Sequence, residues 1–231
     1  MAKADIYGGK DPRDLPLYSI PVAARLVRLP RTTLRSWVRG RSYPTKAGPR
    51  RAAPVVVPPT PDFLSFTNLV EAHVLAAMRR EHALKLETVR AAVRFLRKES
   101  GQEQPLAYEQ FLTDRVDLFV QRVGQLINVT RGGQLAIRSA IEESLKRVGY
   151  DQGRAVRLFP LIRADRRTVV IDPRISFGRP VLVGTGIPVE VIADRFKAGD
   201  SIGHLSEDYG VSPDLVEDAV AALMEDTIEA A

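Results

Sequence analysis

Four prolines fall within the eight residues 54–61, and they constrain the fold of this chain more than any other feature. Proline has no backbone N–H to donate, and its ring clashes with the preceding helical turn, so this stretch cannot be helical. We expect an extended strand or a linker there. The stretch ends a first segment, residues 1–60, which is followed by a middle region, residues 61–165, and a last segment, residues 166–231.

The composition is that of a chain that can build real hydrophobic cores. Of its 231 residues, 45% are hydrophobic, which is enough for one large domain or a few small ones. The absence of cysteine excludes disulfides and thiolate metal sites. No apolar run reaches the ~20 residues that span a membrane, and the first residues lack the apolar stretch of a signal peptide. We therefore expect a soluble, cytoplasmic protein with no membrane partner.

The charges are distributed unevenly along the chain. Residues 1–60 carry 12 Lys and Arg against 3 Asp and Glu, whereas residues 198–231 carry 9 Asp and Glu and no Lys or Arg. A basic segment favours a polyanion such as DNA, because each phosphate that it neutralises releases a counterion. The acidic end cannot serve that partner, and it suits a basic protein or is simply a solvated surface.

Residues 18–41 have the pattern of two short helices joined by a turn. Ser19 can cap a helix that begins near Pro21, and a second helix is expected from Pro30 to Arg39, where Gly40 ends it. Apolar residues fall on one side of each helix, and these are Val22, Ala23 and Leu26 in the first and Leu34, Trp37 and Val38 in the second.

The outer side of the second helix and the basic turn after it, residues 41–51, form the candidate DNA-binding surface. Arginine can contact guanine edges in the major groove, and Ser and Thr hydroxyls can contact phosphates. The turn has β-capable ends and would lie as a wing along the phosphate backbone. The alternative is an ordinary Arg-rich surface helix. The candidate DNA-binding residues are Arg31, Thr32, Arg35, Ser36, Arg39, Arg41, Tyr43, Lys46, Arg50 and Arg51.

In Tyr18-Ser19-Ile20, Ala23-Ala24-Arg25-Leu26 and Thr33-Leu34-Arg35, the first segment resembles the winged helix-turn-helix of the MerR superfamily. The resemblance implies binding to double-stranded DNA. One short reading helix covers too few base pairs for selective binding, so we also expect a homodimer on a pseudo-palindromic operator.

The middle region is predicted to be α+β, and it contains no motif that indicates chemistry. Two segments with helical periodicity, Leu69–Met78 and Leu86–Leu96, are the expected dimer contact, although they can equally be buried within one chain. A third amphipathic helix is expected over Leu135–Val148. The remaining expectations are β character at Phe111–Thr113 and Asp117–Val123, a turn at Arg131–Gly133, and strands at Ala155–Phe159 and Val169–Ile171.

The last segment is predicted to hold a short β-hairpin and three helices. Strand Val181–Val183 follows a turn, and the helices are expected from Pro188, from Ser201 and from Pro213. The segment resembles a small family, labelled a domain of unknown function, that recurs in antitoxins of the VapB type. The matching residues are Ile171-Asp172-Pro173, Phe177-Gly178-Arg179-Pro180, Gly184-Thr185, Ile187, Val189, Gly199, Tyr209 and Val216.

The order of the two modules resembles that of antitoxins encoded beside a PIN-domain ribonuclease, in which a winged helix-turn-helix comes first. The last two helices also have helix-turn-helix spacing, but their acidic residues would repel phosphate. We therefore interpret them as part of a trihelical protein-interaction module, or as a plain acidic surface. The candidate partner-binding residues are Asp214, Glu217, Asp218 and Glu225.

Other chemistry is weakly indicated, and we expect no enzyme, cofactor or metal site. His73 and His82 are nine residues apart, so they do not share a helix face as a metal-binding pair would. A nuclease-type cluster of Asp114, Asp117, Asp165 and Asp172 would consist of residues that more often form turns.

The sequence thus predicts an α+β, mostly helical protein. Its expected function is that of a DNA-binding antitoxin, which represses its own operon and neutralises a PIN-domain ribonuclease toxin. The alternatives are a stand-alone MerR-like regulator with a ligand-binding middle domain and, less favoured, a metal-dependent nuclease.

Overall fold

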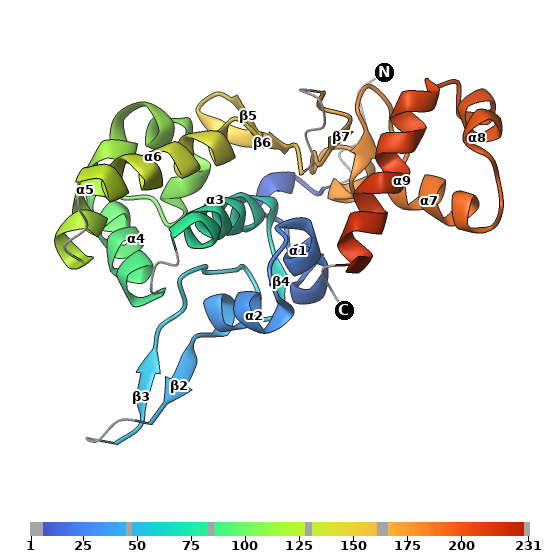
Figure 1. The fold of residues 1–231 in the computed structure, drawn as a ribbon. Helices are drawn as coiled ribbons and strands as arrows, with labels where there is room; N and C mark the ends of the chain where they lie inside the picture. The colour runs from blue at the N-terminus through green and yellow to red at the C-terminus, as the bar shows by residue number, and fades with distance from the viewer. Residues whose placement is uncertain (1–6, 45–47, 83–85, 128–130, 161–165, 229–231) are drawn as a thin grey trace. The chain divides into compact units, whose positions relative to one another are not determined.

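The computed structural model describes residues 7–44, 48–82, 86–127, 131–160 and 166–228. The chain divides into two compact units, Met1–Ala155 and Val156–Ala231. Both are mainly helical, and the described strands pair only two at a time (Figure 1). In the described part of the chain, no helix combines the length and the apolar character needed to cross a membrane.

The first unit opens with the predicted pair of short helices. The elements are η1 (Pro12–Asp14), β1 (Tyr18–Ser19), α1 (Ile20–Leu26), α2 (Arg31–Arg39), β2 (Arg41–Tyr43), β3 (Arg50–Ala52) and β4 (Phe63–Leu64). β1 pairs antiparallel with β4, and β2 pairs antiparallel with β3.

The predicted cap of α1 is corrected by the structure. Ser19 occupies the capping position, but its side chain makes no capping hydrogen bond. Its backbone belongs to β1, where it pairs with Phe63. The N–H of Ile20 instead donates to the carbonyl of Asp62 at 3.2 Å. One of the free N–H donors in the first turn of α1 is therefore satisfied by the residue that directly precedes β4.

Helices complete the first unit. They are α3 (Phe66–His82), α4 (Leu86–Ser100), η2 (Pro105–Ala107), the π-helical turn η3 (Phe111–Arg115), α5 (Val116–Ile127) and α6 (Arg131–Leu145), and the strand β5 (Val148–Asp151) follows and pairs with β6 (Arg154–Leu158).

The helix α3 is the core of the first unit. It packs against α6, η1, η2 and β4, and its apolar side chains from Leu69 to Met78 are buried. The apolar stripe of α4, from Val89 to Leu96, is buried in the same way against α5 and η2. The two stripes are therefore interior surfaces of one chain, which corrects their expected use as the dimer contact.

Two local predictions in this region are wrong. Phe111–Thr113 and Asp117–Val123 are helical, not β, because Phe111, Phe119 and Val123 pack inward at helical spacing. The rings of Phe111 and Phe119 meet edge to face, with centroids 5.9 Å apart. The predicted turn at Arg131–Gly133 is the first turn of α6, where buried Ile137 and Ile141 four residues apart outweigh the two glycines.

The second unit contains the predicted strands and helices, as β7 (Val169–Val170), η4 (Ser176–Gly178), β8 (Val181–Leu182), α7 (Val189–Lys197), α8 (Ile202–Tyr209) and α9 (Pro213–Ile228). β7 pairs antiparallel with β8. Ser201 caps α8 as predicted, since its hydroxyl accepts from the N–H of His204, and Gly210 ends the helix in a left-handed conformation. The core includes Leu182, Ile192, Leu205, Val216 and Ala219.

Candidate nucleic-acid interface

The turn between α1 and α2 depends on one left-handed residue. Arg28 has a φ of 53°, a conformation that residues with a Cβ rarely adopt. The N–H of Leu29 donates to the carbonyl of Ala24 at 2.9 Å. These features close the last turn of α1 and reverse the chain toward α2, as in other helix C-termini that end in a left-handed residue.

The proline-rich stretch holds α2 from its inner side. Leu34 and Trp37 are at most 1% exposed. The carbonyl of Trp37 accepts the N–H groups of Val55 and Val56 at 2.8 and 3.2 Å, so the stretch satisfies a carbonyl at the end of α2. Both valines are fully buried. Residues 54–61 are not helical, as predicted, but the chain bends at Val55, Val56 and Pro59 and turns at Pro61, and the stretch is packed and is not a free linker.

The same stretch is tied to the helical core of the unit. The Nη2 of Arg97 on α4 donates to the carbonyl of Val55 at 2.8 Å, and the Nδ2 of Asn68 on α3 donates to the carbonyl of Val57 at 3.0 Å. The helix α2 is therefore linked, through the proline-rich stretch, to the side chains of Asn68 on α3 and Arg97 on α4. A helix that is held rigidly before binding loses less conformational entropy when it binds a partner such as DNA.

The outer face of α2 is polar and basic. Arg31, Thr32 and Arg35 are exposed as predicted, and the two arginines lie one helical turn apart on the same face. Ser36 differs from the prediction, because it is only partly exposed and its hydroxyl donates to the carbonyl of Thr33 at 2.7 Å. Its oxygen can still accept a hydrogen bond, but it cannot donate to a phosphate in this arrangement.

Arg39 has a partner that was not predicted from the sequence. It forms an ion pair with Asp62, which directly precedes β4, and both side chains are well exposed. A phosphate would have to compete with this carboxylate for Arg39. The sequence gives one indication of this pair. Asp62 is the only acidic residue between Asp14 and Glu71, so it is the one carboxylate in this basic region with which an arginine could pair.

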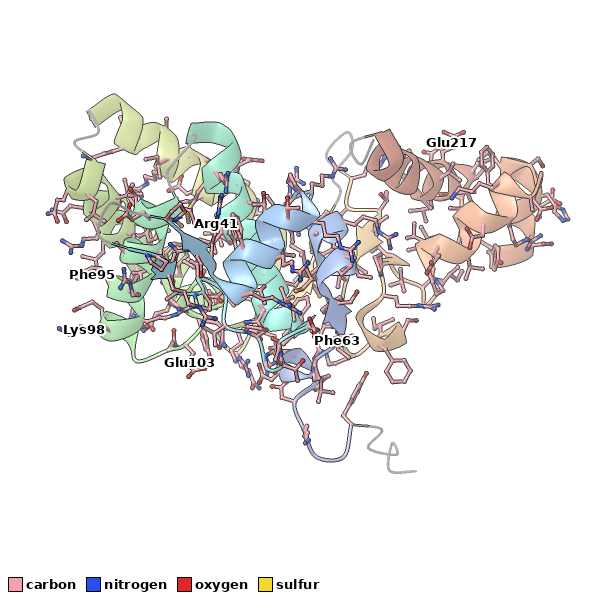
Figure 2. All side chains as sticks on the ribbon, turned by 90° about the horizontal axis from the view of Figure 1, so that it is seen from below. Arg41, Phe63, Phe95, Lys98, Glu103 and Glu217 are labelled. Carbon is pink, nitrogen blue, oxygen red and sulfur yellow. The ribbon has the colours of Figure 1, made fainter. Side chains whose placement is uncertain are left out.

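The predicted wing is the hairpin β2–β3, which projects beyond the end of α2 (Figure 1). Arg41 pairs with Ala52, and Ser42 with Arg51. Arg41, labelled in Figure 2, and Arg51 are exposed and lie on opposite faces of the ribbon, so they would contact different phosphates. The other wing candidates fall outside the described residues, namely Lys46 as a whole and the side chains of Tyr43 and Arg50.

The acidic candidates at the C-terminal end are partly neutralised. Arg166 bonds Asp214 through Nη1 at 2.5 Å and lies 3.7 Å from the Oδ2 of Asp218. The prediction that Asp218 faces outward is wrong, because this residue is only 4% exposed. Glu217 is exposed on α9 (Figure 2), and the side chain of Glu225 lies outside the described part.

The candidate metal ligands are dispersed in the structure. His73 is buried and its Nε2 bonds a carbonyl of α6 at 3.1 Å, whereas buried Asp172 accepts from Arg157 and Arg174. Where the structure describes the chain, no three His, Asp or Glu side chains form a group that would hold a metal ion. Asp165 lies outside the described residues.

Two parts of the chain match known protein families. Residues 16–93 match the family described as "Putative DNA-binding HTH domain", and this match contains α1, α2, the wing and α3. Residues 169–222 match the family described as "Protein of unknown function (DUF433)", from β7 into α9.

Two proteins of Mycobacterium tuberculosis (strain ATCC 25618 / H37Rv) are similar over most of the chain. One is named "Putative antitoxin VapB45" and is 30% identical over 229 residues, which cover 91% of this chain and 95% of the relative. The other is named "Uncharacterized protein Rv2308" and is 26% identical over 217 residues, 90% of each chain. The crystal structure of Rv2018 from the same species aligns with a TM-score of 0.68 at 25% identity, covering 90% of this chain and 98% of the other.

Proposed function

Because this chain belongs to the family of "Putative antitoxin VapB45", we propose that it is the antitoxin of a type II toxin–antitoxin system. In this proposal it binds the operator of its own operon as a homodimer and represses transcription. It also neutralises a toxin, which we propose to be a PIN-domain ribonuclease. The toxin class rests on the resemblance of the two modules to antitoxins encoded beside such ribonucleases.

The observation that carries the DNA-binding part is the exposed face of α2. Arg31 and Arg35 lie on one face of a helix whose opposite side is fixed by Leu34 and Trp37. Such a helix can enter the major groove, where each guanidinium can make two hydrogen bonds to a guanine. Thr32 and the wing would contact phosphates, as in the winged helix-turn-helix of the MerR superfamily.

The test of DNA binding is a mobility-shift titration with the DNA upstream of the gene. The variant Arg31→Ala/Arg35→Ala should lose about 1–3 kcal/mol for each arginine that reads a base, and the base preference should relax at those positions. The control is Arg94→Ala/Lys98→Ala, which removes two exposed cations at the same spacing from α4. Equal operator affinity for the two variants would refute the assignment of α2.

The test of toxin binding is co-purification with the product of the neighbouring gene. A stable complex that suppresses ribonuclease activity supports the antitoxin. Operator affinity that instead responds to a small ligand, with no protein partner, supports a stand-alone regulator and refutes the antitoxin.

A further inference from the structure

The loop between β7 and β8 exposes an aromatic ring on a strained backbone. Phe177 is 63% exposed. It is the middle of three consecutive left-handed residues, with φ values of 47° at Ser176, 54° at Phe177 and 75° at Gly178. Only glycine adopts this conformation without a penalty, so the first two residues are held there by the surrounding structure.

Hydrogen bonds on both sides fix the loop. The hydroxyl of Ser176 donates to the carbonyl of Gly186 at 3.0 Å, across the hairpin. The N–H of Gly178 donates to the carbonyl of Ile175 at 2.9 Å, and the N–H of Arg179 donates to the carbonyl of Ser176 at 3.1 Å. The ring is therefore presented by a rigid segment, which reduces the entropy lost when a partner binds it.

A buried carboxylate holds two arginines at the start of the same loop. Asp172 is almost fully buried, and it accepts the N–H of Arg174 at 2.9 Å and the Nε atoms of Arg174 and Arg157 at 3.2 and 3.3 Å. Both guanidinium groups remain about half exposed. Between Asp172 and Glu190 the sequence contains Arg174 and Arg179 and no acidic residue, and both arginines are exposed, so the loop that carries the ring is basic.

The stability of the second unit does not account for this arrangement. The described core of the unit is built from β7, β8 and the three helices, and Phe177 is not part of it. An exposed aromatic ring on a loop with exposed arginines has the composition of an interface anchor, since aromatic residues and arginine carry much of the binding energy at protein interfaces.

We propose that the loop of residues 172–179 is the anchor through which this chain docks its protein partner, with Phe177 inserted into an apolar pocket. The rim of that pocket carries a carboxylate, which pairs with Arg179. A nucleic acid fits less well, because base-stacking surfaces combine several aromatic rings with unneutralised cations, whereas Asp172 already pairs with two of the arginines here. The inference rests on the proposed antitoxin function, in which the partner is the toxin.

The test uses the full chain and the purified neighbouring-gene product as the probe. Phe177→Gly removes the ring and relieves the left-handed strain, so the melting temperature should stay the same or rise. Affinity for the probe should fall by roughly tenfold or more, as expected for a central anchor. Leu135→Ala is the matched control, because Leu135 on α6 is also 63% exposed, and it should leave affinity unchanged. Operator binding should be unchanged in both variants.

The outcomes separate this inference from the proposed function. If the wild-type chain binds the probe and Phe177→Gly binds it equally well, the anchor is refuted and the antitoxin stands. If the wild-type chain does not bind the probe, both are refuted. Arg179→Glu should weaken binding and slow association at low salt, because it reverses a charge that faces the carboxylate rim. If Phe177→Gly and Arg179→Glu lose affinity for a single-stranded oligonucleotide but bind the protein probe as the wild-type chain does, the choice of a protein partner is overturned.

Discussion

At the scale of single residues, Gly40 determines how the hairpin β2–β3 leaves α2. Its φ is +74°, and a Cβ built on it would lie 2.3 Å from the backbone carbonyl oxygen of Ala52. We predict that Gly40→Ala lowers the free energy of unfolding by about 2–4 kcal/mol and weakens operator binding, because the clash is with backbone and β3 must shift. The matched control is Gly153→Ala, which has the same φ but open space around it, and which should cost only about 1 kcal/mol. If thermal melts show that Gly40→Ala and Gly153→Ala lose similar amounts of stability, the loss comes from the backbone strain at positive φ that they share, and not from the clash with Ala52.

Glu71 gives a second prediction at this scale. Its side chain is fully buried in α3, and burial raises its pKa to about 8, although the Arg97 guanidinium 3.8 Å away acts in the opposite direction. The folded state therefore holds a proton that the unfolded chain releases between pH 4.5 and pH 8, so stability falls as the pH rises through this range. We predict that Glu71→Gln reduces that fall, on the order of 2–4 kcal/mol, in denaturant unfolding measured from pH 5 to pH 9. The same pH dependence in both proteins would contradict the prediction.

At the scale of elements, the hairpin β2–β3 should contribute affinity without sequence preference. Arg41 and Arg51 lie on opposite faces of the ribbon, so each can neutralise a separate phosphate. We predict that Arg41→Ala/Arg51→Ala weakens binding to operator and random DNA alike. The slope of log affinity against log salt should fall by roughly one for each phosphate that is no longer neutralised. The measurement is a salt series by fluorescence anisotropy, with Arg94→Ala/Lys98→Ala as the charge-matched control. A slope equal to that of the control variant would mean that the wing does not touch DNA.

The same scale shows which elements could be predicted from the sequence. The helices α1, α2, α7, α8 and α9 have prolines or glycines at their ends and a clear apolar period, so local information locates them. The sequence does not locate α5, because the aromatic and β-branched residues of this helix also suit strands.

The candidate site could be predicted less completely than the helices that carry it. The ion pair of Arg39 with Asp62 joins residues 23 positions apart, and Arg166 meets Asp214 across 48 positions. Such pairs depend on how the elements pack, and periodicity carries no information about that packing.

At the scale of the whole molecule, the length of α2 favours more than one chain for each operator if α2 reads DNA as proposed. The helix α2 has nine residues, so it is about 13 Å long and reads only a few base pairs. Because the stripes of α3 and α4 are buried within one chain, the proposed homodimer would have to use another surface. We predict two chains bound to each operator, with half-sites centred about 34 Å apart or a multiple of that distance. Native mass spectrometry of the saturated complex gives the stoichiometry, and footprinting gives the spacing. One chain bound at saturation, with a single protected half-site, would contradict a dimeric repressor and leave the helix-turn-helix assignment intact.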